Sequence, residues 1–199
     1  RVLTDKTIDV EADREERWPF TGDVPVRFAD ITLTTAVTGY QRRDAERGET
    51  MDTLSLDLPE QTLDTRALYY TVPPEVESEL REAGDLPGAI HAAEHAMISM
   101  FPTEFLCDRG DIGGLSTPVH PHTGRPTIFI YDGYPGGVGL VREGFDAIGS
   151  LAETTLSMLR SCDCDAGCPA CVQSPQCGNA NDPLDKELAI TLLAALTGD

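Results

Sequence analysis

The chain has 199 residues, enough for one domain or a domain with an appendage, and 40% of them are hydrophobic, as in ordinary folded proteins. Thirty-four acidic residues face fifteen basic ones, giving a formal net charge of -19. This acidity argues against free-standing, nonspecific binding of nucleic acid, which depends on neutralising phosphates. The sequence also contains no apolar run that approaches a membrane span, so no membrane partner is expected.

The acidic residues are spread along the chain instead of forming a tail, and Lys6 and Lys186 are the only lysines. Self-repulsion of this size strains a compact domain at low ionic strength. In molar salt the Debye length falls to about 3 Å, which removes most of the repulsion. The composition is therefore halophilic in character, and we expect a soluble protein of a salt-rich cytoplasm.

The first third of the chain, residues 1–73, is typical of an antiparallel sheet with one polar and one buried face. It is rich in β-branched residues, and polar and apolar positions partly alternate. A short strand is expected around Val2, Ile8 and Val10, with further strands at 26–43, 53–58 and 68–72. Because the chain begins with Arg1 instead of Met, we expect it to be a piece of a longer protein.

From Pro73 onward the periodicity becomes helical, and residues 74–199 are expected to form a second, mostly helical part. A proline and acidic residues mark the first helix start. Helices are expected at 74–84 and at 89–101, with Pro102 as the stop. Two more are expected: a helical stretch that follows residues 132–140 and ends at Arg160, and a final helix from Pro183 to Gly198. Residues 107–126 are expected to form a loop and residues 127–131 a short strand. The predicted fold class is α+β.

Five of the six cysteines fall between Cys162 and Cys177, spaced C-x-C-x3-C-x2-C-x5-C. Cys168 and Cys171 lie in a knuckle whose thiolates can point at one ion, and closed four-thiolate sites hold structural zinc. Disulfides are the alternative, but five crowded cysteines leave one unpaired, and no signal peptide indicates an oxidising compartment. The favoured zinc ligands are Cys162, Cys164, Cys168 and Cys171; the competing set replaces Cys162 with Cys177.

His91-Ala92-Ala93-Glu94-His95 spells H-x-x-E-H, the pattern of the inverted zinc metallopeptidases. On a helix both imidazoles share a face, so they can hold a zinc ion with Glu94 as general base. The third protein ligand is usually an acid further along, and no partner motif is apparent. The alternative is that His91 and His95 are partly buried on an alanine-rich packing helix.

Glycines at a strand-to-helix turn, Gly136 and Gly137 among them, place backbone amides where they can contact phosphate, although close packing is the simpler interpretation. Arg109 and Arg125 are close in sequence to this turn and are candidate DNA contacts together with the two glycines. The alternative is that each arginine pairs with a neighbouring acid. Other residues of reactive type are interpreted as structural or solvated: Cys107, His120 and His122.

Several sequence blocks together resemble the C-terminal zinc-binding domain of the MrfA-like DNA-repair helicases, a DEAD/DEAH-box group. In chain order these are IHAAEHAMI, CDRGDIGG, PTIFIYDGYPGGVGL, CDCDAGCPACVQSPQCGN and NDPLDK. The resemblance covers about residues 87–196. It implies a parent enzyme that uses ATP and Mg²⁺ to move 3′ to 5′ along single-stranded DNA, with the zinc domain packed on its motor domains. The four cysteine ligands carry over to Cys162, Cys164, Cys168 and Cys171.

The chain contains neither a Walker A segment nor an acidic ATPase box, so by itself it is not expected to hydrolyse ATP. We interpret it as a zinc-stabilised accessory module that braces the motor and shapes the single-strand path, with 1–73 as the end of the helicase body. A zinc metallohydrolase that uses His91, Glu94 and His95 is the alternative of a different class. A free-standing, zinc-stabilised interaction domain is the third hypothesis.

Overall fold

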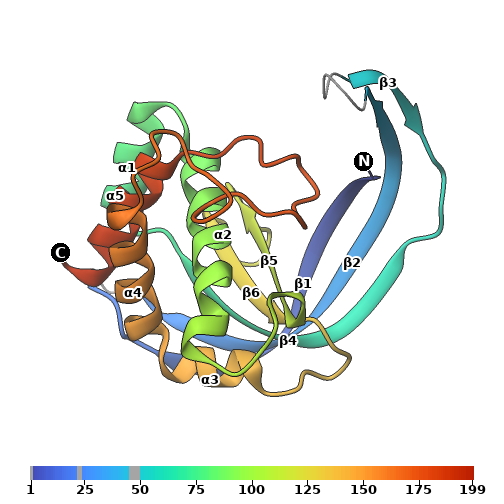
Figure 1. The fold of residues 1–199 in the computed structure, drawn as a ribbon. Coiled ribbons are helices and arrows are strands. Elements are labelled where there is room, and N and C mark those ends of the chain that lie inside the picture. Colours follow the sequence, from blue (N-terminus) through green and yellow to red (C-terminus); the bar gives the residue numbers. More distant parts are fainter. Residues whose placement is uncertain (1, 22–23, 45–49) are drawn as a thin grey trace.

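The computed structural model describes residues 2–21, 24–44 and 50–199, which form one antiparallel sheet covered on one face by helices (Figure 1). The strand order is β1-β2-β4-β6-β5, with β3 paired to β2 beside this path. The strands are β1 (Val2–Arg17), β2 (Val26–Arg43), β3 (Thr50–Ser55), β4 (Gln61–Thr71), β5 (Ile112–Thr117) and β6 (Thr127–Asp132). The helices are α1 (Pro74–Ala83), α2 (Leu86–Glu104), α3 (Leu140–Asp146), α4 (Ile148–Ser161) and α5 (Lys186–Thr197), with a 3-10 turn η1 (Arg109–Asp111).

The predicted α+β class is confirmed, and the strand predicted at 26–43 coincides with β2. The prediction that 107–126 is a loop is wrong in part, because β5 lies within it and pairs with β6. β1 is also longer than expected and continues through the charged residues to Arg17. Its partner β2 satisfies the backbone along this length, so exposed charged side chains do not end the strand.

Two expected helix boundaries are also wrong. Pro102 lies inside the last turn of α2, which continues to Glu104. α5 begins at Lys186, not at Pro183, and its N-cap is Asp185, whose side chain accepts a hydrogen bond from the backbone of Leu188. An aspartate at this position satisfies a helix amide that has no partner within the helix.

The sheet separates two hydrophobic clusters because neighbouring residues of a strand point to opposite faces. On β4, Leu68 and Tyr70 belong to the cluster shared with the helices, whereas Tyr69 belongs to the cluster on the other face. β6 divides in the same way, with Ile128 and Ile130 facing the helices. β6 pairs with β4, so strands from both sides of the expected boundary at residue 73 share one sheet.

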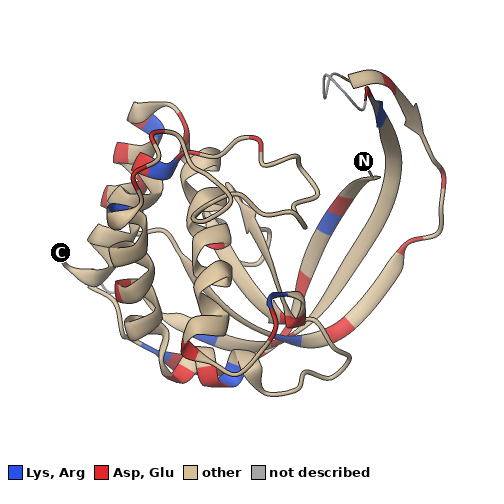
Figure 2. Ribbon diagram, viewed as in Figure 1, with Lys and Arg blue, Asp and Glu red and all other residues tan. Residues whose placement is uncertain are grey.

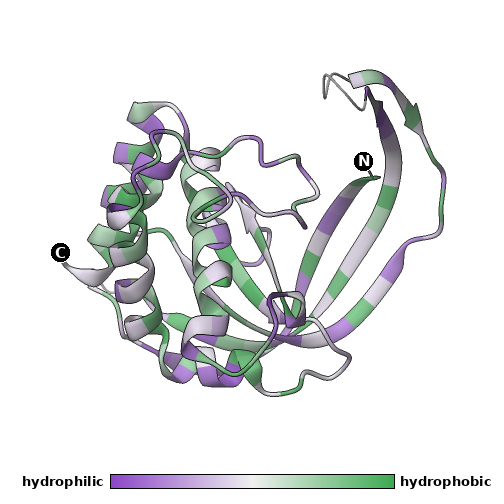
Figure 3. Ribbon diagram, viewed as in Figure 1, coloured by the Kyte–Doolittle hydropathy of each residue, from purple (hydrophilic) through white to green (hydrophobic). Residues whose placement is uncertain are grey.

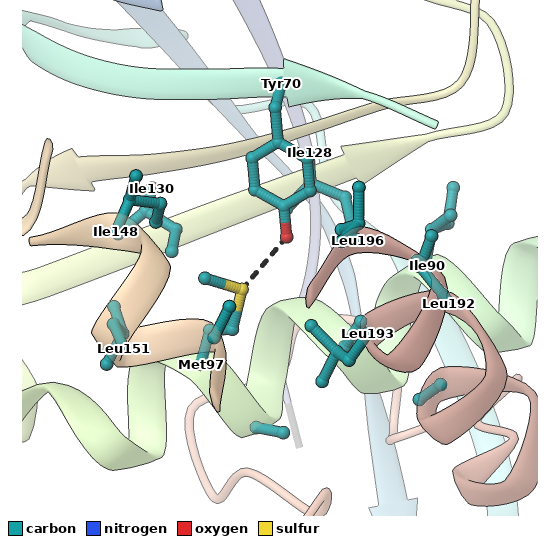
Figure 4. Close-up of a cluster of buried hydrophobic side chains, with 14 of the residues drawn as sticks. Tyr70, Ile90, Met97, Ile128, Ile130, Ile148, Leu151, Leu192, Leu193 and Leu196 are labelled. Atoms are coloured by element: carbon teal, nitrogen blue, oxygen red, sulfur yellow. Dashed lines mark hydrogen bonds between the residues drawn. The ribbon is translucent and has the colours of Figure 1, made fainter. Parts of the chain in front are cut away.

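Helix α2 is central to the helical layer and is buried along most of its length. It packs against β5, β6, α4 and α5, which explains why a helix with apolar residues on every side is stable here. Figure 4 shows the core between β4, β6, α2, α4 and α5, where the hydroxyl of Tyr70 donates to Sδ of Met97 at 2.9 Å. Hydrophobic colouring in Figure 3 extends over much of α2 and β6.

The sheet curves so that β1 contacts β5 as well as its partner β2. The β1–β2 pairing contains register shifts that bend the two strands, as β-bulges do. His120, which follows β5 in the chain, helps to hold β1 beside β5, because its Nε2 lies 2.9 Å from the carbonyl oxygen of Ile8. Within the described residues, no helix is both long and apolar enough to cross a membrane.

Candidate metal centre

Four cysteine sulfurs converge in the segment between α4 and α5, with all four Sγ atoms within 4.8 Å of one another. The Sγ–Sγ distance is 3.5 Å for Cys162–Cys164 and for Cys164–Cys171, 3.6 Å for Cys162–Cys168 and 3.7 Å for Cys168–Cys171. Zn–S bonds of about 2.3 Å imply a tetrahedron with edges of about 3.8 Å. The four sulfurs therefore fit one zinc ion. All six cysteines are free, so the alternative of disulfides is not realised.

The knuckle between Cys168 and Cys171 is built by its own backbone. The amide of Cys171 donates to the carbonyl of Cys168 at 3.0 Å, and the amide of Cys168 donates to Sγ of Cys171 at 3.2 Å. Gly167 precedes it with a φ of 100°, and a Cβ there would lie 2.4 Å from Cγ2 of Val172. A glycine is therefore required where the chain enters the knuckle.

Lys186 connects α5 to the cysteine cluster. Its side chain is buried, and Nζ donates to the carbonyl oxygens of Cys162 and Cys164 at 2.7 Å each. These hydrogen bonds fix the backbone of two candidate zinc ligands from outside the cluster. Groups that orient metal ligands in this way contribute to metal affinity.

The cysteine cluster places four thiols close together, and their pKa values differ. A hydrogen bond from the backbone of Cys164 lowers the pKa of Cys162 to about 7. Burial raises the pKa of Cys171 to about 12. Zinc binds thiolates, and its charge compensates the repulsion that otherwise keeps some of these thiols protonated.

Cys177 lies away from the four clustered cysteines and beside α2 instead. Its Sγ forms a second group with the imidazoles of His91 and His95, and the three possible ligand atoms lie within 4.8 Å of one another. The hydrogen bond with His91 lowers the pKa of Cys177 to about 5 against the opposing effect of burial. The sequence did not predict this group, because His95 and Cys177 are far apart in the chain.

The second group lines a cavity of about 820 Å³ between β1, α2, β5 and the segment before α5. Glu94 also lines it and is buried, and burial raises the pKa of this carboxyl group. Gly114 on β5 allows the close approach of Glu94, because a Cβ at Gly114 would lie 2.6 Å from Oε1 of Glu94. The H-x-x-E-H residues thus line a cavity, as the ligands of an open metal site do.

The sequence profile of the MrfA zinc-binding domain matches residues 93–172, a range that contains the four clustered cysteines. The uncharacterized protein MJ1572.1 of Methanocaldococcus jannaschii is 37% identical over 110 residues, which are 54% of this chain and 98% of that protein. The chain belongs to the MrfA zinc-binding domain family. The resemblance of the sequence blocks to this family is therefore confirmed.

Relatives of this MrfA-type domain include much longer helicases. The ATP-dependent helicase YprA of Bacillus subtilis is 27% identical over 169 residues, 84% of this chain and 21% of YprA. The ATP-dependent helicase HRQ1 of Saccharomyces cerevisiae is 27% identical over 187 residues, 88% of this chain and 17% of HRQ1. The chain thus spans about a fifth of each of these two proteins.

The crystal structure of the DUF1998 helicase MrfA bound to DNA has the same fold. The TM-score is 0.68 at 23% identity, and the match covers 98% of this chain and 25% of MrfA. A second MrfA crystal structure matches with a TM-score of 0.60 over 96% of this chain. The β-rich first third of the chain is thus part of the shared fold as well as the zinc-binding segment.

The two candidate arginines of the MrfA-type domain have different surroundings. Arg125 donates from Nη2 to the carbonyl of Val72 at 2.8 Å and lies 3.4 Å from Oε2 of Glu77. Arg109 lines the cavity, and its buried Nε has no hydrogen-bond partner among the described residues. Burial lowers the pKa of Arg109. An anion in the cavity would satisfy Arg109, whereas Arg125 already has an acidic partner.

The glycine turn satisfies its amides internally. Gly136 donates to the carbonyl of Asp64 at 2.8 Å, and Gly137 donates to that of Tyr134 at 3.0 Å. The buried carboxylate of Asp132 accepts hydrogen bonds from three further backbone amides, those of Val138, Gly139 and Val141. The positive φ of Gly136 and Gly137 supports this turn, and DNA contact by the two glycines stays a prediction.

Proposed function

We propose that this chain is the zinc-stabilised accessory module of an ATP-dependent 3′–5′ DNA helicase that acts in DNA repair. In the parent enzyme it braces the motor domains and shapes the path of single-stranded DNA. ATP and Mg²⁺ bind in the motor domains, and the module contributes the structural zinc through Cys162, Cys164, Cys168 and Cys171. In this proposal residues 1–73 belong to the end of the helicase body, and residues 74–199 form the zinc-binding part.

The four-sulfur cluster is the observation that carries the proposal. It closes the segment between α4 and α5, and that segment packs on α2 through the hydrogen bonds of His91 to Pro183 and His95 to Val172. A structural zinc ion contributes directly to folding free energy. A rigid segment between α4 and α5 suits a module that holds the motor domains of the parent helicase in place. The likeness to MrfA in fold and the helicase relatives support the same role.

DNA contact is proposed for Arg109 foremost among the four candidates. Its buried Nε lacks a partner among the described residues, and the arginine lines a cavity, where a guanidinium suits a phosphate oxygen. The acidic body elsewhere is unfavourable for phosphate, so a local contact positions the strand without strong binding by the module alone.

The expected location is the cytoplasm of a salt-rich cell.

Variants of the parent helicase test this function. We expect Cys168→Ser to release the structural zinc and to lower duplex unwinding at least about tenfold, because the segment between α4 and α5 loses its cross-link. Zinc content and unwinding of a 3′-tailed duplex are measured together. Cys107→Ser is the matched control, since Cys107 is half-buried and lies outside both ligand groups. Wild-type unwinding by a zinc-free Cys168→Ser enzyme contradicts the bracing role.

Arg109→Ala in the same enzyme separates bracing from DNA contact. We expect weaker binding of single-stranded DNA with unchanged zinc content, and a smaller dependence of the affinity on salt. Arg81→Ala is the control, because this exposed arginine pairs with Glu77 on its own helix. Equal DNA affinity in all three proteins leaves the module with bracing alone.

A further inference from the structure

His91 and His95 lie one turn apart on α2, and their rings meet edge to face with centroids 4.3 Å apart. Cys177 approaches from the segment before α5, and its Sγ lies 3.5 Å from Nε2 of His91. A tetrahedral zinc ion with Zn–N near 2.0–2.1 Å and Zn–S near 2.3 Å places nitrogen and sulfur about 3.6 Å apart. The observed separation is the one that a shared zinc ion requires.

The other ring nitrogens fix which atoms are available as ligands. Nδ1 of His91 lies 2.7 Å from the carbonyl oxygen of Pro183, and Nδ1 of His95 lies 2.8 Å from that of Val172. A carbonyl oxygen only accepts, so each Nδ1 carries a hydrogen, and Nε2 is the nitrogen left to bind a metal ion. Metal-binding histidines are held in this way by a carbonyl or carboxylate on the second nitrogen.

Cys177 is held in place from the opposite side. The amide of Asn181 donates to its Sγ at 3.3 Å. The side chain of Asn181 in turn accepts from the amide of Ser174 at 2.7 Å and donates to the carbonyl of Ser174 at 3.1 Å. The turn that carries Cys177 is thus fixed before any ion binds. The sulfur of Cys177 and one ring nitrogen of each histidine thus lie around one small volume.

The surroundings favour a cation with one free coordination position. Glu94 is buried on the same helix but is not a member of the ligand group, so it does not complete the coordination. The three ligands border the cavity of about 820 Å³, which leaves space for a water molecule or an anionic oxygen. Catalytic zinc sites likewise combine three ligands drawn from histidine, cysteine and carboxylate with an open fourth position.

We propose that His91, His95 and Cys177 bind a second zinc ion, separate from the four-cysteine zinc, with its fourth position open to the cavity. The chain then holds two metal sites: the four-cysteine site lies within the segment between α4 and α5, and the second site joins that segment to α2. The open position takes an oxygen ligand, either water or the oxygen of an anion. Arg109 borders the same cavity and supplies positive charge for such an anion.

Zinc content per chain tests the second site. The protein is incubated with excess zinc, desalted and measured by mass spectrometry. We expect two zinc ions in the wild-type chain and in Cys107→Ser, and one in Cys177→Ser. Thermal unfolding shows whether each variant is folded. One zinc in the wild-type chain, or two in Cys177→Ser, overturns the proposal.

X-ray absorption at the zinc edge decides the question without a variant. The fully loaded wild-type chain is expected to show nitrogen ligands at imidazole distance in addition to sulfur. A shell of sulfur alone overturns the proposal and leaves Cys177 and His91 as a hydrogen-bonded pair. His91→Gln gives a second test should Cys177→Ser fail to fold: the nitrogen signal is expected to weaken, and an unchanged signal overturns the proposal.

Discussion

Asp132 explains why a glycine turn between β6 and α3 does not need an external anion. Its carboxylate accepts from the amides of Val138, Gly139 and Val141 at 3.1–3.2 Å, and the side chain is 1% exposed. Gly137 is also required here, because a Cβ would lie 2.9 Å from Oδ2 of Asp132. The residue thus serves as an internal substitute for the anion that such a turn would otherwise bind.

Asp132→Asn is expected to lower the free energy of unfolding by about 1–3 kcal/mol, because an amide replaces an acceptor of three backbone hydrogen bonds in a buried site. Urea unfolding of the zinc-loaded chain measures the loss. Asp57→Asn is the control, since Asp57 is exposed. Equal stability of the two variants would show that the turn does not depend on the carboxylate.

The segment between α4 and α5 is the element that depends most on ligands and side chains, because no helix or strand satisfies its backbone. Lys186 bridges its beginning to α5 through the carbonyls of Cys162 and Cys164. Asp185 ties its end to α2, since the amide of Asp185 donates to the carbonyl of Gly88 at 3.1 Å. Zinc and these contacts together replace regular secondary structure.

Lys186→Met is expected to weaken zinc binding by the four cysteines about 10–100-fold, the usual effect of losing a group that orients metal ligands. Competition with a chelator measures the affinity. Lys6→Met is the matched control, because Lys6 donates to the hydroxyl of Tyr131 and does not contact the four cysteines. An unchanged affinity in Lys186→Met would mean that zinc alone fixes the two carbonyls.

At the scale of the whole molecule, the net charge of -19 is distributed over strands and helices, as the red segments in Figure 2 show. Several arginines pair with acids at the surface, including Arg42 with Asp52 at 2.8 Å and Arg142 with Asp146 at 3.1 Å. Exposed pairs contribute only about 0–1 kcal/mol each. The acidic excess therefore dominates the electrostatics of the folded state.

The melting temperature is expected to rise from low salt to molar KCl, because screening removes the repulsion among excess acids while weak surface pairs lose little. Calorimetry of the zinc-loaded chain over this range measures the change. Potassium glutamate at equal ionic strength distinguishes screening from a specific effect of chloride. A melting temperature that is constant or decreases with salt contradicts the halophilic interpretation.

The sequence by itself determined the α+β class, most strands of the first third and the existence of a cysteine-based zinc site. These features depend on local patterns: alternation of side chains in strands, and four cysteines close in sequence. The boundaries of helices and strands were predicted less accurately than their presence, because pairing with a neighbouring strand overrides local preferences. β5 in the expected loop and the charged half of β1 are examples.

Only the tertiary structure decided where Cys177 lies. His91 and Cys177 are 86 residues apart, and α2 and the segment before α5 meet through packing that no local pattern specifies. The same packing placed Arg109 beside a cavity and gave Arg125 an acidic partner. Contacts between distant residues depend on how the elements bury their apolar faces together. Spacing therefore predicted the four-cysteine site and a candidate histidine pair, whereas folding brought Cys177 to that pair.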